Sequence, residues 1–343
     1  MLMLLKIKRD VDNMISSGLT FGIYPLSVAG TPLGLAVGPE DNYEKIQLAL
    51  CELSGESKKL LPRNYLIYTK EWEAEMLSNA DCYLDAGLLG DLTIGCGDWT
   101  NNKEPEIELE NWIDFIQKIV DRFGPHLASI QITNEPNLSF MEGSKPYIIQ
   151  ALIEGVIAAK RETRKHNLPI KIGFGSVPEG PAAVPHFWEK LAEAGNKIFI
   201  DSVDFVGHNF YIDVFEDQPL DLKEITSSVE HTLRNLREES LVTANIPVSV
   251  PIRVTENGWP TGKNPIANIE RSYDRQSEVL EAIIRKVYDL RLKLNISHYE
   301  LFGLRDADSC KEDLFHQYGI MRDDYSPKPA YNTFKKLIHE LGV

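Results

Sequence analysis

The amino-acid sequence predicts an α/β fold, a (β/α)8 or TIM barrel, on the basis of three observations. Short runs rich in apolar and β-branched residues alternate with amphipathic helical patterns along the chain. Eight such runs can be placed in the 343 residues. That leaves about 40 residues for each strand and helix unit, as expected for this barrel. Several runs are continuously apolar, which is usual for parallel strands covered on both faces.

The predicted strands are separated by segments with the period of amphipathic helices. In residues 111–124, apolar residues recur every three or four positions, and the pattern ends at Gly124. Residues 274–291 show the same period. In chain order, we expect the strands at residues 20–24, 65–68, 92–95, 129–133, 170–174, 203–208, 252–255 and 298–303.

A doubly wound open sheet is the main rival of the barrel. Such a sheet normally carries a glycine-rich phosphate loop after an early strand, and the sequence has none. No Ser- or Gly-rich linker divides the chain. We therefore predict one barrel domain over residues 1–343, with residues 1–18 as an extension before the first strand.

The charge of the chain argues against nucleic acid as a partner. The net charge is −15, from 51 acidic and 36 basic residues, and a chain this acidic repels phosphate backbones. The same argument disfavours polyanionic sugars.

The four cysteines are far apart and show no paired spacing, so we expect reduced thiols. The composition indicates no oligomeric state.

The first residues do not resemble a secretion signal. Five apolar residues precede Lys6, which is too short for the core of a signal peptide. No later segment reaches the length of a transmembrane helix. We therefore expect a cytoplasmic protein without a membrane partner.

Two of the predicted strands end at a glutamate. The strand at 129–133 runs into "TNEP", in which Asn134 precedes Glu135, and the strand at 252–255 runs into Glu256 of "VTENG". These are the fourth and seventh strands, and side chains at the carboxyl ends of barrel strands meet at one mouth. We therefore expect the two carboxylates to face each other across a cleft.

A facing pair of carboxylates is what hydrolysis of a glycosidic bond requires. One carboxyl group keeps its proton and donates it to the leaving oxygen, while the other attacks the anomeric carbon or activates water. A non-catalytic glycan-binding barrel is the alternative. A barrel that has lost its activity would usually have lost one of the two glutamates, and both are present here. A metal-dependent barrel hydrolase lacks ligands, because the eight histidines form no His-x-His or His-Glu-x-x-His pattern. We expect no metal and no cofactor.

From the fourth strand to the C-terminus, the sequence resembles the clan A glycoside hydrolases, which are retaining (β/α)8 enzymes. The segments that carry the resemblance are "TNEP", "VTENG", "DFVGHNFY", "ELFGLRDAD" and "SPKPAYNTFKKL". "VTENG" is similar to the nucleophile motif of family 1 β-glucosidases, whereas the following "GWP" resembles family 17 β-glucanases. The resemblance implies a glycosidase that acts on an oligosaccharide or glycoside of neutral β-linked sugars. The sugar, its linkage and endo or exo cleavage stay open.

The resemblance also implies roles for individual residues. Glu135 would be the acid/base and Glu256 the nucleophile, with their carboxyl groups about 5–5.5 Å apart. Asn134 would bind the sugar 2-hydroxyl, and Tyr211 would donate a hydrogen bond to the nucleophile. The charge of Glu256, together with partial burial, would raise the pKa of Glu135.

Further side chains are expected to line the mouth. His208 and Asn209 belong to the segment on the sixth strand, and Phe302 is the aromatic residue nearest to the sugar platform that the family has on the eighth. Trp99 and Trp259 could be stacking platforms for sugar or could be core residues.

The sequence departs from the family at several positions. Phe210 stands where the family usually has a tyrosine, and Arg63 precedes its predicted strand rather than ending it. Glu300 and Arg305 are expected to form an ion pair in the mouth. Three other tryptophans fall in helical patterns and are expected in the core: Trp72, Trp112 and Trp188.

Overall fold

The computed structural model describes residues 18–31, 34–99, 104–216, 218–264 and 269–343. Apart from Gly18, the predicted N-terminal extension lies outside the described residues. Within them, no helix is long and apolar enough to pass through a membrane. All four cysteines are described and unpaired.

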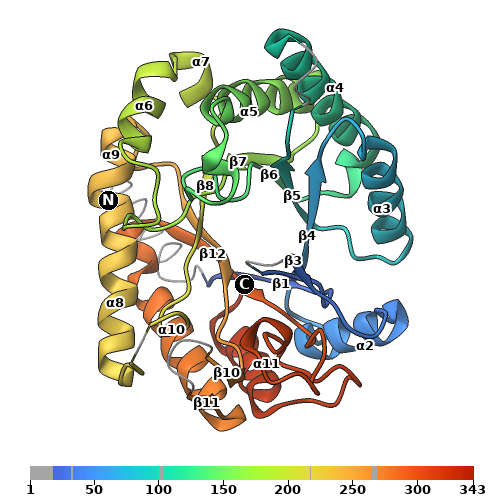
Figure 1. Cartoon of the computed structure of the whole chain (residues 1–343), viewed down its shortest axis with the longest axis vertical. Coiled ribbons are helices and arrows are strands. Elements are labelled where there is room, and N and C mark those ends of the chain that lie inside the picture. The colour runs from blue at the N-terminus through green and yellow to red at the C-terminus, as the bar shows by residue number, and fades with distance from the viewer. Residues whose placement is uncertain (1–17, 32–33, 100–103, 217, 265–268) are drawn as a thin grey trace, which may run out of the picture.

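Eight parallel strands close into a barrel, as the sequence predicts (Figure 1). The first strand, β1, is hydrogen-bonded to both the last strand, β12, and to β4. That double pairing rules out the open sheet. The barrel strands are β1 (Thr20–Tyr24), β4 (Leu60–Tyr68), β5 (Asp91–Cys96), β6 (Ser129–Ile132), β7 (Lys171–Phe174), β8 (Phe205–Asn209), β9 (Ile252–Asn257) and β12 (Ile296–Phe302).

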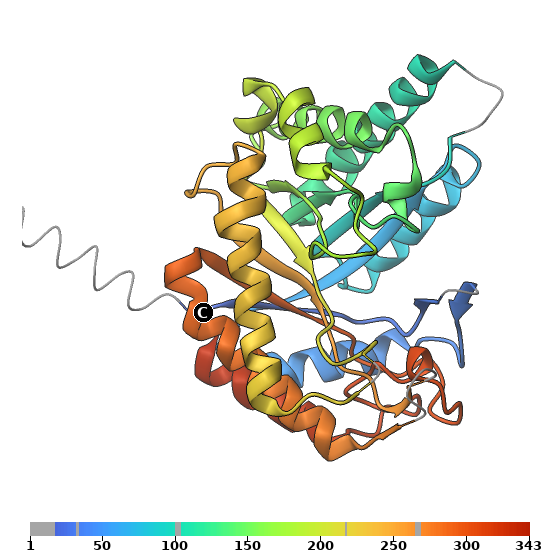
Figure 2. The ribbon, with the colours of Figure 1, turned by 60° about the vertical axis from the view of Figure 1, so that its left-hand side comes forward.

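Helices surround the barrel, and their apolar faces cover the outer side of the strands (Figures 1 and 2). Local capping sets where they begin: Asp221 and Glu224 form a capping box at the start of α8, and Ser272 caps α10. The helices are α2 (Tyr43–Ser54), α3 (Glu73–Asp85), α4 (Pro105–Phe123), α5 (Ile148–Lys165), α6 (Phe187–Ala194), α7 (Lys197–Ile200), α8 (Leu222–Asn235), α9 (Leu241–Thr243), α10 (Tyr273–Leu294) and α11 (Pro329–Leu341).

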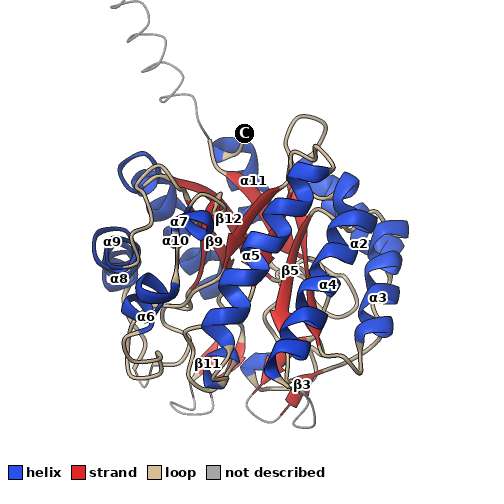
Figure 3. Cartoon of the chain, turned by 90° about the horizontal axis from the view of Figure 1, so that it is seen from above, coloured by secondary structure: helices blue, strands red, loops and turns tan. Residues whose placement is uncertain are grey.

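Short elements follow the carboxyl ends of barrel strands. One hairpin pairs β2 (Ala29–Thr31) with β3 (Gly34–Ala36), and another pairs β10 (Gly262–Lys263) with β11 (Glu270–Arg271). Figure 3 shows β3 and β11 at the same end of the barrel. In the described part of the chain, the connections also contain three 3₁₀ turns, η1 (Gly124–His126), η2 (Glu142–Ser144) and η4 (Leu314–His316), and one π turn, η3 (Leu236–Ser240).

The interior of the barrel contains buried charges, and these correct two of the predictions. Arg63 lies within β4 rather than before it, and its guanidinium is 3.3 Å from Glu300 and 3.6 Å from Asp91. The predicted second strand starts only at residue 65, whereas here Arg63 is an inward side chain with two buried carboxylates beside it. The predicted Glu300–Arg305 pair is therefore wrong, because Arg305 pairs with Asp41 instead.

The three tryptophans predicted to be in the core differ in burial. Trp112 and Trp188 are buried under the helices, as predicted. Trp72 is 50% exposed, so that prediction is wrong. It stands at the N-cap of α3, before the apolar face of that helix begins, and its position is therefore not one that faces the barrel.

Candidate active site

Glu135 and Glu256 come from the ends of two strands that lie across the barrel mouth from each other. β6 ends at Ile132, and the chain turns through Thr133, which has a left-handed φ of 61°, before Asn134 and Glu135. Glu256 lies near the end of β9 and is 9% exposed, where the pairing of β9 with β8 shifts register.

The side-chain amide of Asn209, at the end of β8, joins the two carboxylates. Its nitrogen lies 3.2 Å from Glu135 Oε1 and 3.1 Å from Glu256 Oε2, and 3.2 Å from the amide oxygen of Asn134. The Asn209 oxygen accepts a hydrogen bond from the Thr255 hydroxyl, which fixes the orientation of the amide. The sequence places Asn209 in the mouth, and the structure shows that it contacts both glutamates.

Two tyrosines donate hydrogen bonds to Glu256. The Tyr211 hydroxyl lies 2.6 Å from Oε1, which is the contact that the sequence predicts, and the Tyr65 hydroxyl lies 2.9 Å from Oε2. Arg63 Nε donates in turn to the Tyr65 oxygen at 3.0 Å. Tyr65 is the first residue of the predicted second strand, but it is not among the predicted site residues because no motif marks it.

The environments of the two glutamates favour different protonation states. Burial, with the charge of Glu256 as a further cause, raises the pKa of Glu135 to about 8. Burial also raises the pKa of Glu256, but the hydrogen bonds from Tyr211 and Tyr65 and the charge of Arg63 oppose that rise. Glu135 is therefore the carboxyl group that keeps its proton near neutral pH, and Glu256 is the one that ionises first.

A third carboxylate, Glu142, supports the loop after β6. It is 8% exposed and accepts hydrogen bonds from the backbone N–H groups of Asn134, Glu135 and Cys96, at 2.6, 2.8 and 2.6 Å. Nothing in the sequence indicates this contact, because Glu142 follows the motif in a segment without regular period.

Aromatic rings line one wall of the mouth next to Glu256. The Phe302 ring is stacked on Tyr24 at 4.8 Å and lies edge-on to Tyr65 and Tyr318. Phe302 is thus placed in the mouth, as expected, and its neighbours add tyrosine hydroxyl groups that can meet a polar ligand.

His208 does not point into the mouth, which corrects its expected place. Successive residues of a strand point to opposite faces, and Asn209 takes the inward face. His208 is buried on the outer side of β8, where Nδ1 lies 2.8 Å from the Ser176 hydroxyl. Among the described residues its other nitrogen has no protein partner, and His208 lines a cavity of about 40 Å³ with His231. Burial lowers the pKa of His208 to about 3, so the ring is neutral.

Trp99 and Trp259, the two candidate platforms for sugar stacking, differ in burial and in their contacts. Trp99 follows β5 and is half-buried, with its ring stacked on Tyr147 at 3.8 Å. Trp259 is 2% exposed and donates from Nε1 to Asp213 at 3.2 Å. Trp259 is therefore a core residue, although it also lines the pocket described next.

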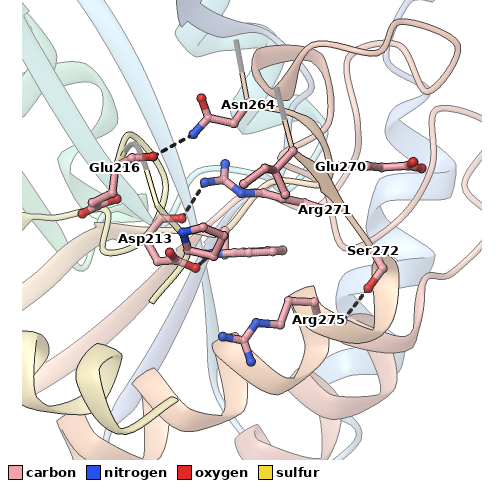
Figure 4. Close-up of a pocket in the computed structure, with 10 residues that line it drawn as sticks. Asp213, Glu216, Asn264, Glu270, Arg271, Ser272 and Arg275 are labelled. Atoms are coloured by element: carbon pink, nitrogen blue, oxygen red, sulfur yellow. Dashed lines mark hydrogen bonds between the residues drawn. The ribbon is translucent and has the colours of Figure 1, made fainter. Parts of the chain in front are cut away.

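A second pocket, of about 110 Å³, lies between the loops that follow β8 and β9 (Figure 4). Arg271 crosses it and donates to the backbone oxygen of Asp213 at 2.6 Å, while Asn264 donates to that of Glu216 at 3.2 Å. Neither catalytic candidate lines this pocket. Across the described part of the chain, no three His, Cys, Asp or Glu side chains gather as a metal site would require.

The fold and these contacts define a (β/α)8 barrel with a pair of facing carboxylates at its mouth. The sequence matches no protein-family model and no curated protein. Its fold is similar to the β-D-glucuronidase of Dictyoglomus thermophilum (14% identity, TM-score 0.58) and the β-glucuronidase of Ruminococcus gnavus (14%, 0.59). It is also similar to a family 39 glycoside hydrolase of Bacteroides cellulosilyticus (16%, 0.57).

The alignments cover 95% of this chain in all three cases, but 51%, 50% and 64% of those proteins. The chain thus spans about half the length of the two glucuronidases. At such low identities the likeness establishes the barrel fold.

Proposed function

We propose that this chain is a retaining glycoside hydrolase that cleaves neutral β-linked sugars through a covalent glycosyl-enzyme. The observation that carries the proposal is the Asn209 amide nitrogen, which lies within 3.2 Å of both carboxylates. The two oxygens that it contacts can be no more than about 6.3 Å apart, which supports the retaining separation of about 5–5.5 Å over the inverting one of about 6.5–9.5 Å.

In the first step, Glu256 attacks the anomeric carbon while Glu135 donates its proton to the leaving oxygen. The raised pKa of Glu135 keeps that proton available near neutral pH, and Tyr211 and Tyr65 keep the attacking carboxylate ionised and oriented. In the second step, Glu135 acts as the base that takes a proton from water, and the attack of water on the anomeric carbon releases Glu256.

Asn134 and Asn209 are the groups that we assign to the sugar beside this bond. The Asn134 oxygen is engaged by Asn209, which leaves its amide N–H groups free to meet the sugar 2-hydroxyl. A hydrogen bond at that hydroxyl strengthens in the transition state and so contributes to rate.

Charge in the mouth supports a neutral sugar. Two of the similar proteins are named for glucuronic acid, which carries a carboxylate. Here the ionised groups near the sugar are Glu256 and, as the pH rises past neutrality, Glu142. The cation that acts on Glu256, Arg63, is already paired with Glu300 and Asp91. A uronate would therefore be repelled in this mouth.

A panel of nitrophenyl β-glycosides and β-linked oligosaccharides tests the proposal. We expect hydrolysis of at least one neutral substrate and, by ¹H NMR, a first product with retained anomeric configuration. Uronide members of the same panel should be cleaved far more slowly. A product of inverted configuration would overturn the retaining mechanism, and a panel without any hydrolysis would favour the glycan-binding alternative.

Substitution Tyr211→Phe should slow the reaction without unfolding the protein. It removes a 2.6 Å hydrogen bond to Glu256 that lowers the pKa of this carboxylate. A hydrogen bond to a charged group contributes about 1.5–3 kcal/mol, so kcat/KM should fall by about 10- to 100-fold. Tyr83→Phe, which changes a tyrosine on α3, is the matched control. Equal kinetics for Tyr211→Phe and wild type would contradict the role.

A further inference from the structure

The loop that presents Asn134 and Glu135 departs from regular strand geometry. Consecutive residues of a strand point to opposite faces, yet the side chains of Asn134 and Glu135 both reach the amide nitrogen of Asn209. Thr133 makes this possible with a φ of 61°. That conformation is strained for a β-branched residue, so the surroundings must hold it in place.

Glu142 is the group in a position to hold this turn. One of its oxygens, Oε2, accepts the backbone N–H groups of both Asn134 and Glu135, and Oε1 accepts that of Cys96 at the end of β5. Its carboxylate thus links the ends of two neighbouring strands. Hydrogen bonds to a buried carboxylate are among the stronger ones in proteins.

The sequence leaves room for this carboxylate at Gly95. A Cβ atom added to Gly95 would lie 3.2 Å from Glu142 Oε1 and 2.6 Å from Ile67 Cδ1. Glycine at this position lets the carboxylate lie over the strand.

We propose that Glu142 is a positioning residue for the reaction: its carboxylate holds the strained turn so that Asn134 and Glu135 both face the bound sugar. The inference rests on the proposed glycosidase function. It also predicts an electrostatic effect, because the charge of Glu142 is one cause of the raised pKa of Glu135. Burial raises the pKa of Glu142 itself to about 7, so it carries that charge increasingly as the pH rises past neutrality.

Two substitutions separate geometry from charge. Glu142→Gln keeps the length of the side chain but loses its charge. Its NH₂ group then faces at least one backbone N–H, and because both are donors, that hydrogen bond is lost. Glu142→Asp keeps the charge but is too short to reach both strand ends. Glu162→Gln is the matched control, because Glu162 is a buried carboxylate at the far end of α5 that pairs with Lys165 and His166.

The first readout is kcat/KM, which reports the first chemical step. For an alkyl glycoside, which needs the proton of Glu135, both Glu142 variants should lose about 100-fold, the scale of effect that a misplaced catalytic group produces. A dinitrophenyl glycoside needs no proton and should lose much less. The dependence of kcat/KM on pH should also change in Glu142→Gln. Its alkaline limb, where Glu135 loses its proton, should move to lower pH because the charge that raises the pKa of Glu135 is gone. Glu142→Asp should keep the limb near its wild-type position.

A second readout does not depend on activity. Crystal structures of wild type and Glu142→Gln should differ at residues 133–135, with Glu135 turned away from Asn209, while Glu162→Gln should leave the turn unchanged. An unmoved turn, or equal losses on both glycosides with an unmoved alkaline limb, overturns the positioning role even where the wild type is an active glycosidase. An inactive wild type refutes the proposed function, and the two crystal structures then still decide whether Glu142 holds the turn.

Discussion

Glu256→Ala should abolish hydrolysis of every glycoside, whatever its leaving group. The substitution removes the proposed nucleophile, and losing a nucleophile in an enzyme with covalent catalysis costs on the order of 10⁵-fold in kcat. An activated dinitrophenyl substrate cannot restore the rate, because the missing bond is the one to the anomeric carbon. The measurement is kcat on both an alkyl and a dinitrophenyl glycoside, with circular dichroism to confirm that the protein is folded.

A small anion should reactivate this variant. The alanine leaves a space that Tyr211, Tyr65 and Asn209 still line with hydrogen-bond donors. Azide can enter it and attack the anomeric carbon directly, so the product should be a glycosyl azide of inverted configuration. Glu162→Ala, which removes a buried carboxylate far from the mouth, should keep wild-type activity and gain nothing from azide. Full activity in Glu256→Ala would end the assignment.

Glu135→Ala should affect the two steps of the reaction differently. For an alkyl glycoside kcat/KM should fall by about 10²–10⁴-fold, the usual contribution of a general acid. A dinitrophenyl glycoside should still react quickly with Glu256. The second step then lacks its base, so the glycosyl-enzyme should accumulate, and intact-protein mass spectrometry should detect it.

Azide should release that intermediate as a product of retained configuration, since it attacks the sugar from the side that Glu135 has left. The opposite pattern, with inverted product from Glu135→Ala and retained product from Glu256→Ala, would exchange the roles of the two residues. Glu135→Gln is a useful companion, because it keeps the size of the side chain while losing its proton.

The barrel could be predicted because its signals are local. Continuous apolar runs mark strands covered on both faces, and the carboxylates at 135 and 256 follow two of them. Once the runs are counted, the barrel geometry brings Glu135 and Glu256 to one mouth. Tyr211 was predicted differently, from the resemblance of "DFVGHNFY" to the clan A glycoside hydrolases.

The remaining site residues depend on contacts that the sequence does not display. Tyr65 reaches Glu256 from a strand whose beginning is obscured by Pro62 and Arg63. His208 and Asn209 were both expected in the mouth from the segment "DFVGHNFY", but adjacent strand residues point to opposite faces, so only Asn209 can lie there.

Glu142 was missed for a different reason. Its hydrogen bonds go to backbone groups, which leave no trace in residue type, and one of them bridges 46 positions to Cys96. The strain at Thr133 is equally invisible, because threonine is an ordinary strand residue.

The buried ion pair between Arg63 and Glu300 has a consequence for the order of events during synthesis. Arg63 lies on β4 and Glu300 on β12, and the pair crosses over β1, where Gly22 leaves the space: a Cβ atom there would lie 2.7 Å from Glu300 Cγ. Arg63 in turn holds the Tyr65 hydroxyl on Glu256. Glu300 belongs to the last barrel strand to be synthesised, so a nascent chain that already contains Glu135 and Glu256 still lacks one of the two carboxylates beside Arg63. The contact between Tyr65 and Glu256 thus gains its full support only when β12 closes the barrel.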